Sequence, residues 1–234
     1  EMQRSLVGSE MCIRDREKPM LKAVLLDLDG TLLDTLGDIQ YYVNEALAAF
    51  SFPPISREQT RRFIGDGAWE LMERAVPHGA KELEACYEYF REHFSRNTQE
   101  RTRLYDGEIE TLSALKARGL KLGVVTNKPQ DATEGCIQKF FPEGLFDFVG
   151  GDTGSFPCKP DPSLAQYAAL SLRVAPSECA FVGDGETDAM VARNAGMFGV
   201  SVLWGYRTQE ELSRVGASRF VSSYEELFRV LTTF

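Results

Sequence analysis

Short apolar runs alternate along the chain with segments in which apolar residues recur at helical spacing. The runs that we expect to form strands lie near residues 23–28, 122–126, 146–149, 179–182 and 199–203. Short runs that end at glycine or at polar residues are typical of strands buried on both faces of a parallel sheet. Because helical segments separate these runs, the right-handed crossover rule predicts an α/β fold with a doubly wound, mostly parallel Rossmann-like sheet.

The chain between the first two predicted strands keeps a helical period for about seventy residues. Apolar residues are spaced as on one face of a helix over 39–50, 68–76 and 83–94. Ser56 with Gln59 forms the signature of a capping box, which predicts the start of one more helix. We therefore expect an α-helical cap inserted into the sheet domain.

The change of period also predicts the bounds of the domains. We expect residues 20–34 and 106–234 to form the Rossmann-like core and residues 35–105 to form the cap. Residues 1–19 have no period, and part of this stretch resembles translated sequencing-adapter read-through. We therefore predict that residues 1–19 are either a non-native extension, with the biological chain beginning at Met20, or an ordinary disordered tail.

Composition narrows the class of protein. A chain of 234 residues with 43% hydrophobic residues suits an ordinary globular protein, and its net charge of -9 argues against nucleic acid or an anionic membrane as a partner. No apolar run approaches the roughly 20 residues that span a bilayer. Five cysteines without CxxC spacing and only two histidines favour reduced thiols over a zinc site. We expect a cytoplasmic protein, and the sequence predicts no oligomeric state.

Two carboxylates follow the first apolar run, at Asp27 and Asp29. Alternate residues of a strand point the same way, so both side chains can reach one pocket if the strand geometry persists. One carboxylate can then attack phosphorus to give an aspartyl-phosphate, while the other transfers protons. Gly30 and Thr31 open a turn whose N–H groups can hold an anion. A calcium loop is discounted, because an EF-hand needs its glycine at the sixth position.

A second acidic cluster follows the fourth predicted strand. Asp184 and Asp188 are four residues apart across a strand-to-helix turn, while Glu186 between them is expected on the surface. Asp188 also suits the simpler role of an acid at a helix start. Carboxylates gathered in one crevice repel one another unless they share a cation, and Mg²⁺ prefers oxygen ligands of this type. The sequence therefore predicts a Mg²⁺ site.

Donors for phosphate oxygens follow other strands. Thr126 and Asn127 stand at the end of the second predicted strand and offer a hydroxyl and an amide. Lys159, next to Pro160, offers an ammonium group toward accumulating negative charge. Alone, Thr-Asn is an ordinary helix-capping pair and a lysine in a loop is usually solvated. Together with the acidic clusters these residues predict a site for a small phosphorylated substrate.

Taken in chain order, four motifs resemble those of the haloacid dehalogenase superfamily. They are Asp27-x-Asp29-Gly30-Thr31, Thr126-Asn127, Lys159-Pro160 and Gly183-Asp184-x-x-x-Asp188. The segments 105–107, 123–129, 150–152 and 204–207 are similar to the phosphoglycolate phosphatases of that superfamily. The resemblance implies a cap after the first motif and a Mg²⁺-dependent phosphomonoester hydrolase that acts through an aspartyl-phosphate. It also implies small phosphorylated metabolites such as 2-phosphoglycolate as substrates.

The resemblance further implies a role for each site residue. Asp27 would attack phosphorus, and Asp29 would protonate the leaving alcohol and then activate water. Thr126 and Lys159 would hold the phosphoryl oxygens, with Asn127, Gly30 and Thr31 shaping the phosphate site. Mg²⁺ would be bound by the Asp27 carboxylate, the Asp29 backbone carbonyl and Asp184, with Asp188 in support. Gly185 stands where the family often has a hydroxyl residue, which weakens any claim for a side-chain contact there.

Other functions remain open at this point. A sugar phosphomutase of the same superfamily uses the same core but returns the phosphoryl group to a sugar. A dehalogenase is disfavoured by the second aspartate at Asp29. A phospho-aspartate signalling domain shares the sheet and the acidic cluster but lacks a large cap, and a catalytically silent binding protein would more readily have lost Asp27 or Asp29. Arg61 and Arg62 are candidates for substrate contact, with exposed helix charges as an equal alternative.

Overall fold

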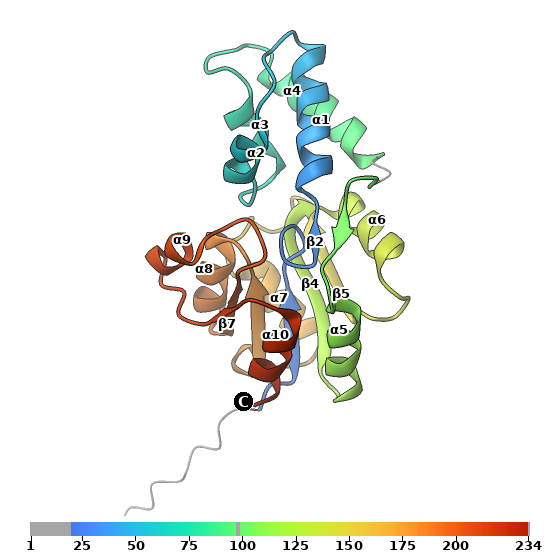
Figure 1. Cartoon of the computed structure of the whole chain (residues 1–234), viewed down its shortest axis with the longest axis vertical. Helices are drawn as coiled ribbons and strands as arrows, with labels where there is room; N and C mark the ends of the chain where they lie inside the picture. Colours follow the sequence, from blue (N-terminus) through green and yellow to red (C-terminus); the bar gives the residue numbers. More distant parts are fainter. Residues whose placement is uncertain (1–19, 97–98, 234) are drawn as a thin grey trace, which may run out of the picture.

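The computed structural model describes residues 20–96 and 99–233, so the predicted extension at residues 1–19 lies outside the described residues. A six-stranded sheet in the order β5-β4-β1-β6-β7-β8 forms the centre, and all its neighbouring strands pair in parallel (Figure 1). The strands are β1 (Ala23–Leu26), β4 (Lys121–Pro129), β5 (Phe148–Asp152), β6 (Cys179–Gly183), β7 (Phe198–Val202) and β8 (Phe220–Val221). The prediction of a doubly wound, mostly parallel Rossmann-like sheet is confirmed.

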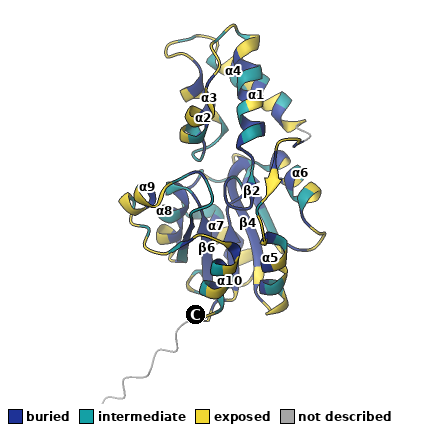
Figure 2. Ribbon diagram, viewed as in Figure 1, coloured by how far each residue is buried: buried dark blue, intermediate teal, exposed yellow. Residues whose placement is uncertain are grey.

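Strand β1 supplies apolar side chains to both faces of the sheet, as the alternation of side chains along a strand requires. Val24 and Leu26 pack in one hydrophobic cluster, and Ala23 and Leu25 pack in another. Helices that carry residues of the first cluster are α5 (Glu108–Ala117), α6 (Gln130–Phe140) and α10 (Tyr224–Thr232). Helices of the second cluster are α7 (Ser163–Ser171) and α8 (Glu186–Ala195). Helices therefore cover both faces of the sheet, as Figure 2 shows by the buried strands between them.

A helical layer lies beyond the carboxyl ends of the strands (Figure 1). It consists of α1 (Leu36–Ala49), α2 (Arg57–Phe63), α3 (Ala68–Ala75) and α4 (Leu83–Ser95). These helices share a third hydrophobic cluster, which also includes Ala132 of α6 and Tyr206 of the sheet domain. An antiparallel pair, β2 (Leu33–Asp34) and β3 (Arg103–Leu104), joins the two connections to the core. The chain therefore enters and leaves the helical layer at one place.

Local signals in the sequence account for several element ends. Ser56 and Gln59 form the predicted capping box at the start of α2, and Gly196 ends α8 in the left-handed conformation. Several strand bounds differ from the prediction, and β4 continues to Pro129 rather than ending near residue 126. Strand β1 ends at Leu26 rather than near residue 28, and β5 begins at Phe148 and continues through the Gly150-Gly151 pair, where the apolar pattern stops. The bounds of core and cap stay a prediction. No helix in the described part of the chain is long and apolar enough to cross a bilayer.

A buried carboxyl group lies at the first residue of α5. Glu108 is only 1% exposed, and its Oε2 accepts a hydrogen bond from the backbone N–H of Tyr105. Burial raises the pKa of Glu108 to about 8, and this hydrogen bond lowers it only in part. Burial favours the neutral form because a carboxylate loses its hydration inside the protein.

The raised pKa of Glu108 predicts a pH dependence of stability. Above about pH 4.5 the unfolded chain releases the Glu108 proton while the folded chain keeps it, so the contribution to stability is lost as the pH rises toward 8. We expect Glu108→Gln, which cannot titrate, to gain stability relative to the wild type over this range, on the order of a few kcal/mol. Urea unfolding of both proteins at pH 5 and pH 8 measures this. The raised pKa of Glu108 is contradicted if the difference in unfolding free energy between the two proteins is the same at pH 5 and at pH 8.

Candidate active site

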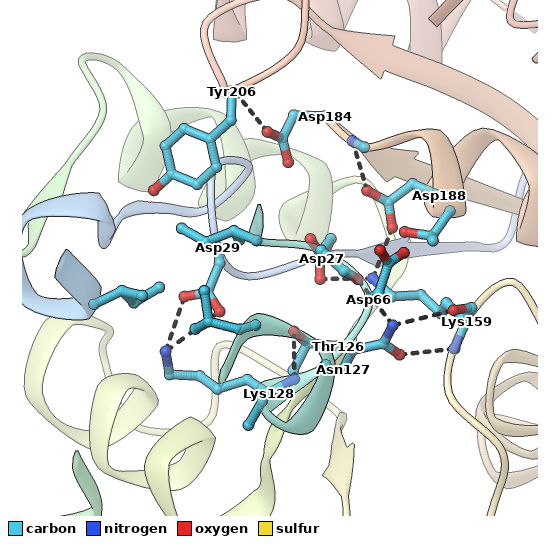
Figure 3. A pocket seen from close by; sticks show the side chains of 18 of the residues that line it. Asp27, Asp29, Asp66, Thr126, Asn127, Lys128, Lys159, Asp184, Asp188 and Tyr206 are labelled. Carbon is cyan, nitrogen blue, oxygen red and sulfur yellow. Dashed lines mark hydrogen bonds and ion pairs between the residues drawn. The ribbon is translucent and has the colours of Figure 1, made fainter. Parts of the chain in front are cut away.

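The candidate site lies where the carboxyl ends of β4, β1 and β6 meet under the helical layer. A cavity of about 390 Å³ opens there, lined by residues of the sheet and of the helical layer. Seven of the predicted site residues line it (Figure 3): Asp27, Asp29, Thr126, Asn127, Lys159, Asp184 and Asp188. Gly30 and Thr31, which were also expected to shape the site, do not line the cavity.

Lys159 forms the central ion pairs of this site. Its Nζ lies 2.7 Å from Asp27 Oδ1 and 2.6 Å from Asp188 Oδ1, and its side chain is 2% exposed. Burial alone lowers the pKa of Lys159, but Asp188 and Asp27 raise it, and the pKa lies above the usual lysine value. The ammonium group is therefore charged and neutralises part of the acidic cluster.

Asn127 holds the backbone of Lys159 in place. Its Oδ1 accepts the Lys159 N–H at 2.7 Å, and its Nδ2 donates to the carbonyl oxygens of Lys159 at 3.2 Å and of Gly65 at 3.0 Å. Gly65 belongs to the loop between α2 and α3. The Asn127 amide thus ties the lysine loop to the helical layer. This contact was not foreseen from the sequence, which assigned Asn127 to the phosphate.

Carboxylates dominate the electrostatics of the cavity. Ligand atoms of Asp27, Asp184 and Asp188 lie within 4.8 Å of one another, and all three residues are buried. Burial and the neighbouring carboxylates raise the pKa of Asp27 to about 6 and that of Asp184 to about 8. A divalent cation would relieve this repulsion, and three carboxylates supply the hard oxygen donors that Mg²⁺ prefers. The donor set therefore fits Mg²⁺.

The Asp184 carboxylate is held by donors from two loops. Thr31 Oγ1 donates to Oδ1 at 3.1 Å, and the Tyr206 N–H donates to Oδ2 at 2.6 Å. Gly30, with a φ of +87°, packs so closely that a Cβ atom there would lie 2.4 Å from Asp184 Oδ2. Gly205 approaches from the other side, where a Cβ would lie 2.3 Å from the Cβ of Asp184. Gly30 and Thr31 thus help to hold the Asp184 carboxylate in place, Thr31 by its hydrogen bond and Gly30 by its close packing.

Asp188 fills the helix-start role that the sequence offered for it, and it also pairs with Lys159. Its Oδ2 accepts the Gly185 N–H at 2.9 Å, which caps helix α8, while Oδ1 pairs with Lys159. Gly185 serves this cap through its backbone, so a side chain at that position is not needed for the contact. Asp188 therefore fixes the lysine as well as the start of the helix.

The carboxylate of Asp29 has a different set of partners. Lys128 Nζ lies 2.9 Å from Oδ1 and 3.3 Å from Oδ2, and Thr35 Oγ1 donates to Oδ1 at 2.7 Å. Sequence reasoning missed both residues. The signal for Lys128 was its place directly after Thr126-Asn127, in a segment that had already been singled out by its resemblance.

Contacts between the helical layer and the core surround the cavity. Arg207 donates to the carbonyl oxygens of Arg61 at 2.6 Å and of Ile64 at 2.8 Å, and Arg61 donates to the Tyr206 carbonyl. Arg207 also pairs with Glu186 at 2.7 Å. Glu186 was expected on the surface, yet its side chain is 34% exposed and lines the cavity.

The two arginines considered for substrate contact differ. Arg61 does not line the cavity, whereas Arg62 does. Arg62 is exposed and pairs with Glu58 at 2.9 Å. Neither arginine contacts the acidic cluster in the described structure.

Comparisons with known proteins agree with this geometry. The model of the haloacid dehalogenase-like hydrolase family matches residues 24–202. A phosphoglycolate phosphatase of Vibrio vulnificus is 32% identical over 221 residues, 90% of this chain and 96% of that protein. One of Xanthomonas campestris is 34% identical over 192 residues, 81% and 86% of the two chains. A crystal structure of a predicted phosphoglycolate phosphatase from Haemophilus somnus superposes with a TM-score of 0.82 at 28% identity, covering 90% of this chain and 97% of that one.

The close packing of Gly30 against Asp184 predicts a specific effect of substitution. Gly30 and Gly119 share a φ of +87°, but nothing lies within 4 Å of a Cβ at Gly119. Gly119→Ala should lose about 1–2 kcal/mol from the backbone conformation alone. Gly30→Ala should lose more, because the Asp184 carboxylate must move, and its kcat/KM should fall about 10-fold or more. Unfolding and phosphatase assays on the pair test this, and equal losses in both variants would contradict it.

Proposed function

Because the chain belongs to the haloacid dehalogenase-like hydrolase family and is a phosphatase, we propose that it is a Mg²⁺-dependent phosphomonoester hydrolase that acts through an aspartyl-phosphate at Asp27. One observation carries this proposal. Asp27, Asp184, Asp188 and Lys159 converge at the carboxyl ends of adjacent parallel strands, at the floor of one cavity. Such a site pairs a carboxylate nucleophile with cations that stabilise a transferring phosphoryl group.

The first half of the reaction forms the covalent intermediate. A carboxylate oxygen of Asp27 attacks phosphorus, the bond from phosphorus to the ester oxygen breaks, and Asp29 gives its proton to the departing alkoxide. Lys159, which contacts Asp27 at 2.7 Å, and the Thr126 hydroxyl hold the phosphoryl oxygens beside the nucleophile. Positioning of this kind supplies much of the rate increase in phosphoryl transfer.

The second half returns the enzyme to its starting state. Asp29, now a carboxylate, takes a proton from water, and the resulting hydroxide attacks the phosphorus of the aspartyl-phosphate. The bond from Asp27 to phosphorus breaks, and inorganic phosphate leaves. The Asp27 and Asp184 carboxylates and the Asp29 backbone carbonyl would hold Mg²⁺, with Asp188 in support through Lys159 or water. Bound there, Mg²⁺ would neutralise negative charge on the phosphoryl oxygens.

We propose that the helical layer, within residues 35–105, acts as the cap over this site. Its side chains Leu71, Phe90 and Phe94 line the cavity and would exclude water from the reaction. A cavity of about 390 Å³ suits a small phosphorylated metabolite. The names of the relatives make 2-phosphoglycolate the first substrate to test. The alternative, a sugar phosphomutase, would return an isomerised sugar phosphate instead of releasing inorganic phosphate.

General features of the chain support proposals for the class of substrate and for the cellular compartment. The net charge of -9 supports a small-molecule substrate over a nucleic acid. Cys86, Cys136, Cys158 and Cys179 are free thiols, which suits a reducing compartment, and we propose the cytoplasm.

Replacement of the nucleophile tests the covalent mechanism. Asp27→Asn should lower kcat by about 10³-fold or more, because an amide cannot form the aspartyl-phosphate. The fold should survive, since Lys159 keeps its pair with Asp188 at 2.6 Å. Phosphate release measured alongside circular dichroism checks both statements. The exposed Asp106 provides a matched control, and Asp106→Asn should keep the wild-type rate. A wild-type rate in Asp27→Asn would remove Asp27 from the nucleophile role.

Removal of divalent cations tests the metal site. Treatment with a chelator should reduce phosphate release to background, and added Mg²⁺ should restore it. Ca²⁺ should restore little, because it takes more oxygen ligands at longer distances than Mg²⁺ does. Full activity in the chelated protein would contradict the Mg²⁺ dependence.

A panel of small phosphomonoesters tests the substrate. We expect 2-phosphoglycolate to rank among those with the highest kcat/KM, with stoichiometric release of inorganic phosphate. Weak turnover of 2-phosphoglycolate beside strong turnover of another ester would reject this substrate while leaving the phosphatase activity intact.

A further inference from the structure

A second buried lysine in the cavity has no place in the mechanism described so far. Lys128 stands on β4, and its side chain is 3% exposed. Its ammonium group pairs with both carboxylate oxygens of Asp29, at 2.9 and 3.3 Å (Figure 3). A buried ammonium group needs such a partner, because desolvation makes an isolated buried charge costly. The pair therefore fixes both side chains relative to each other.

The same ammonium group contacts the helical layer. It lies 4.6 Å from the centre of the Phe94 ring, within the range of a cation–π interaction. Phe94 stands near the end of α4 and is itself buried. Its ring stacks on Phe90 at 5.1 Å and meets the edge of Tyr42, on α1, at 5.8 Å. The packing of α1 against α4 thus sets the position of the Phe94 ring, which contacts the Lys128 ammonium group.

The remaining hydrogen bond to the Asp29 carboxylate also comes from a residue next to the helical layer. Thr35 is the residue before α1, and its hydroxyl donates to Asp29 Oδ1 at 2.7 Å. Both side-chain donors to Asp29 therefore depend on where the helical layer sits. The position of Lys128 depends on the helical layer through the Phe94 ring. The position of Thr35 depends on the layer because Thr35 directly precedes α1.

We propose that Lys128 is a positioning residue that orients the Asp29 carboxylate toward the leaving oxygen. Through the contact with the Phe94 ring, this orientation depends on the helical layer being in place over the cavity. The inference rests on the proposed acid–base role of Asp29. With the layer displaced, the ammonium group loses the ring beneath it and Asp29 loses the Thr35 hydroxyl. Proton transfer to the alcohol is then efficient only when the cavity is covered and water is excluded.

The leaving group provides a readout that a merely structural role would not move. An alkoxide is a poor leaving group and needs the proton from Asp29, whereas p-nitrophenolate departs without one. The quantity to compare is kcat/KM, because it covers binding and the first phosphoryl transfer but not the later hydrolysis of the intermediate. We expect Lys128→Met to lower kcat/KM for ethyl phosphate and for 2-phosphoglycolate about 10- to 100-fold, and for p-nitrophenyl phosphate less than about 3-fold.

A second variant tests the link to the helical layer and serves if Lys128→Met does not fold. Phe94→Leu keeps an apolar side chain but removes the ring beneath the ammonium group, and it should show the same dependence on leaving group with a smaller amplitude. The chain offers a matched control pair in Lys139 and Phe140, where a lysine lies 5.2 Å from a ring on α6. Lys139→Met and Phe140→Leu should change kcat/KM for all three esters equally or not at all.

Each other outcome would overturn the proposal. Equal losses for all three esters in Lys128→Met would mean that the lysine only supports the fold. A loss confined to 2-phosphoglycolate would mean that its ammonium group binds the substrate carboxylate. Unchanged rates for all esters in both variants would leave Lys128 without any part in the reaction. A wild-type protein without activity on any of the three esters would instead reject the proposed function itself, which keeps the two failures distinct.

Discussion

The burial of several like charges in one place is the constraint on which the rest of the site depends. Asp27, Asp184 and Asp188 lie close together and out of water, with Lys159 as the cation between Asp27 and Asp188. Removing one partner from such a buried pair typically costs about 3–5 kcal/mol, because the other charge is left without compensation. One ammonium group cannot balance three carboxylates, so the cluster stays short of positive charge. This deficit of positive charge is what the proposed Mg²⁺ would offset.

Hydrogen bonds of Thr35 and Tyr206 at the start of α1 connect the helical layer to this cluster. Thr35 precedes the helix, but its hydroxyl is used by Asp29 and does not cap the helix. The Tyr206 hydroxyl takes over that role, accepting the N–H groups of Thr35 at 2.9 Å and of Leu36 at 3.1 Å. Tyr206 also donates its own N–H to Asp184. Tyr206 therefore holds the Asp184 carboxylate by its backbone N–H and the start of α1 by its hydroxyl, so it links the acidic cluster directly to the helical layer.

Sequence reasoning reached the fold and most of the cavity floor because those signals are local. Buried strands show as apolar runs, and Asp27 and Asp184 come directly after two of them. The two-residue strands β2, β3 and β8 are too short to carry any period. Lys128 and Tyr206 were missed for another reason. Their partners Asp29 and Thr35 lie 99 and 171 positions away along the chain, so only the folded structure brings them together.

The different duties proposed for Asp27 and Asp29 follow from their surroundings, although the residues are two positions apart. Strand β1 ends at Leu26, and Gly30, with its positive φ, turns the chain so that Asp29 forms a bridge with Leu33. Asp27 thus stays with Asp188 and Lys159 in the acidic cluster. Asp29 instead contacts Lys128 and Thr35, beside the helical layer. Each carboxylate has its own buried lysine partner, Lys159 for Asp27 and Lys128 for Asp29. The turn at Gly30 therefore separates the proposed nucleophile from the proposed acid by giving two chemically identical side chains different neighbours.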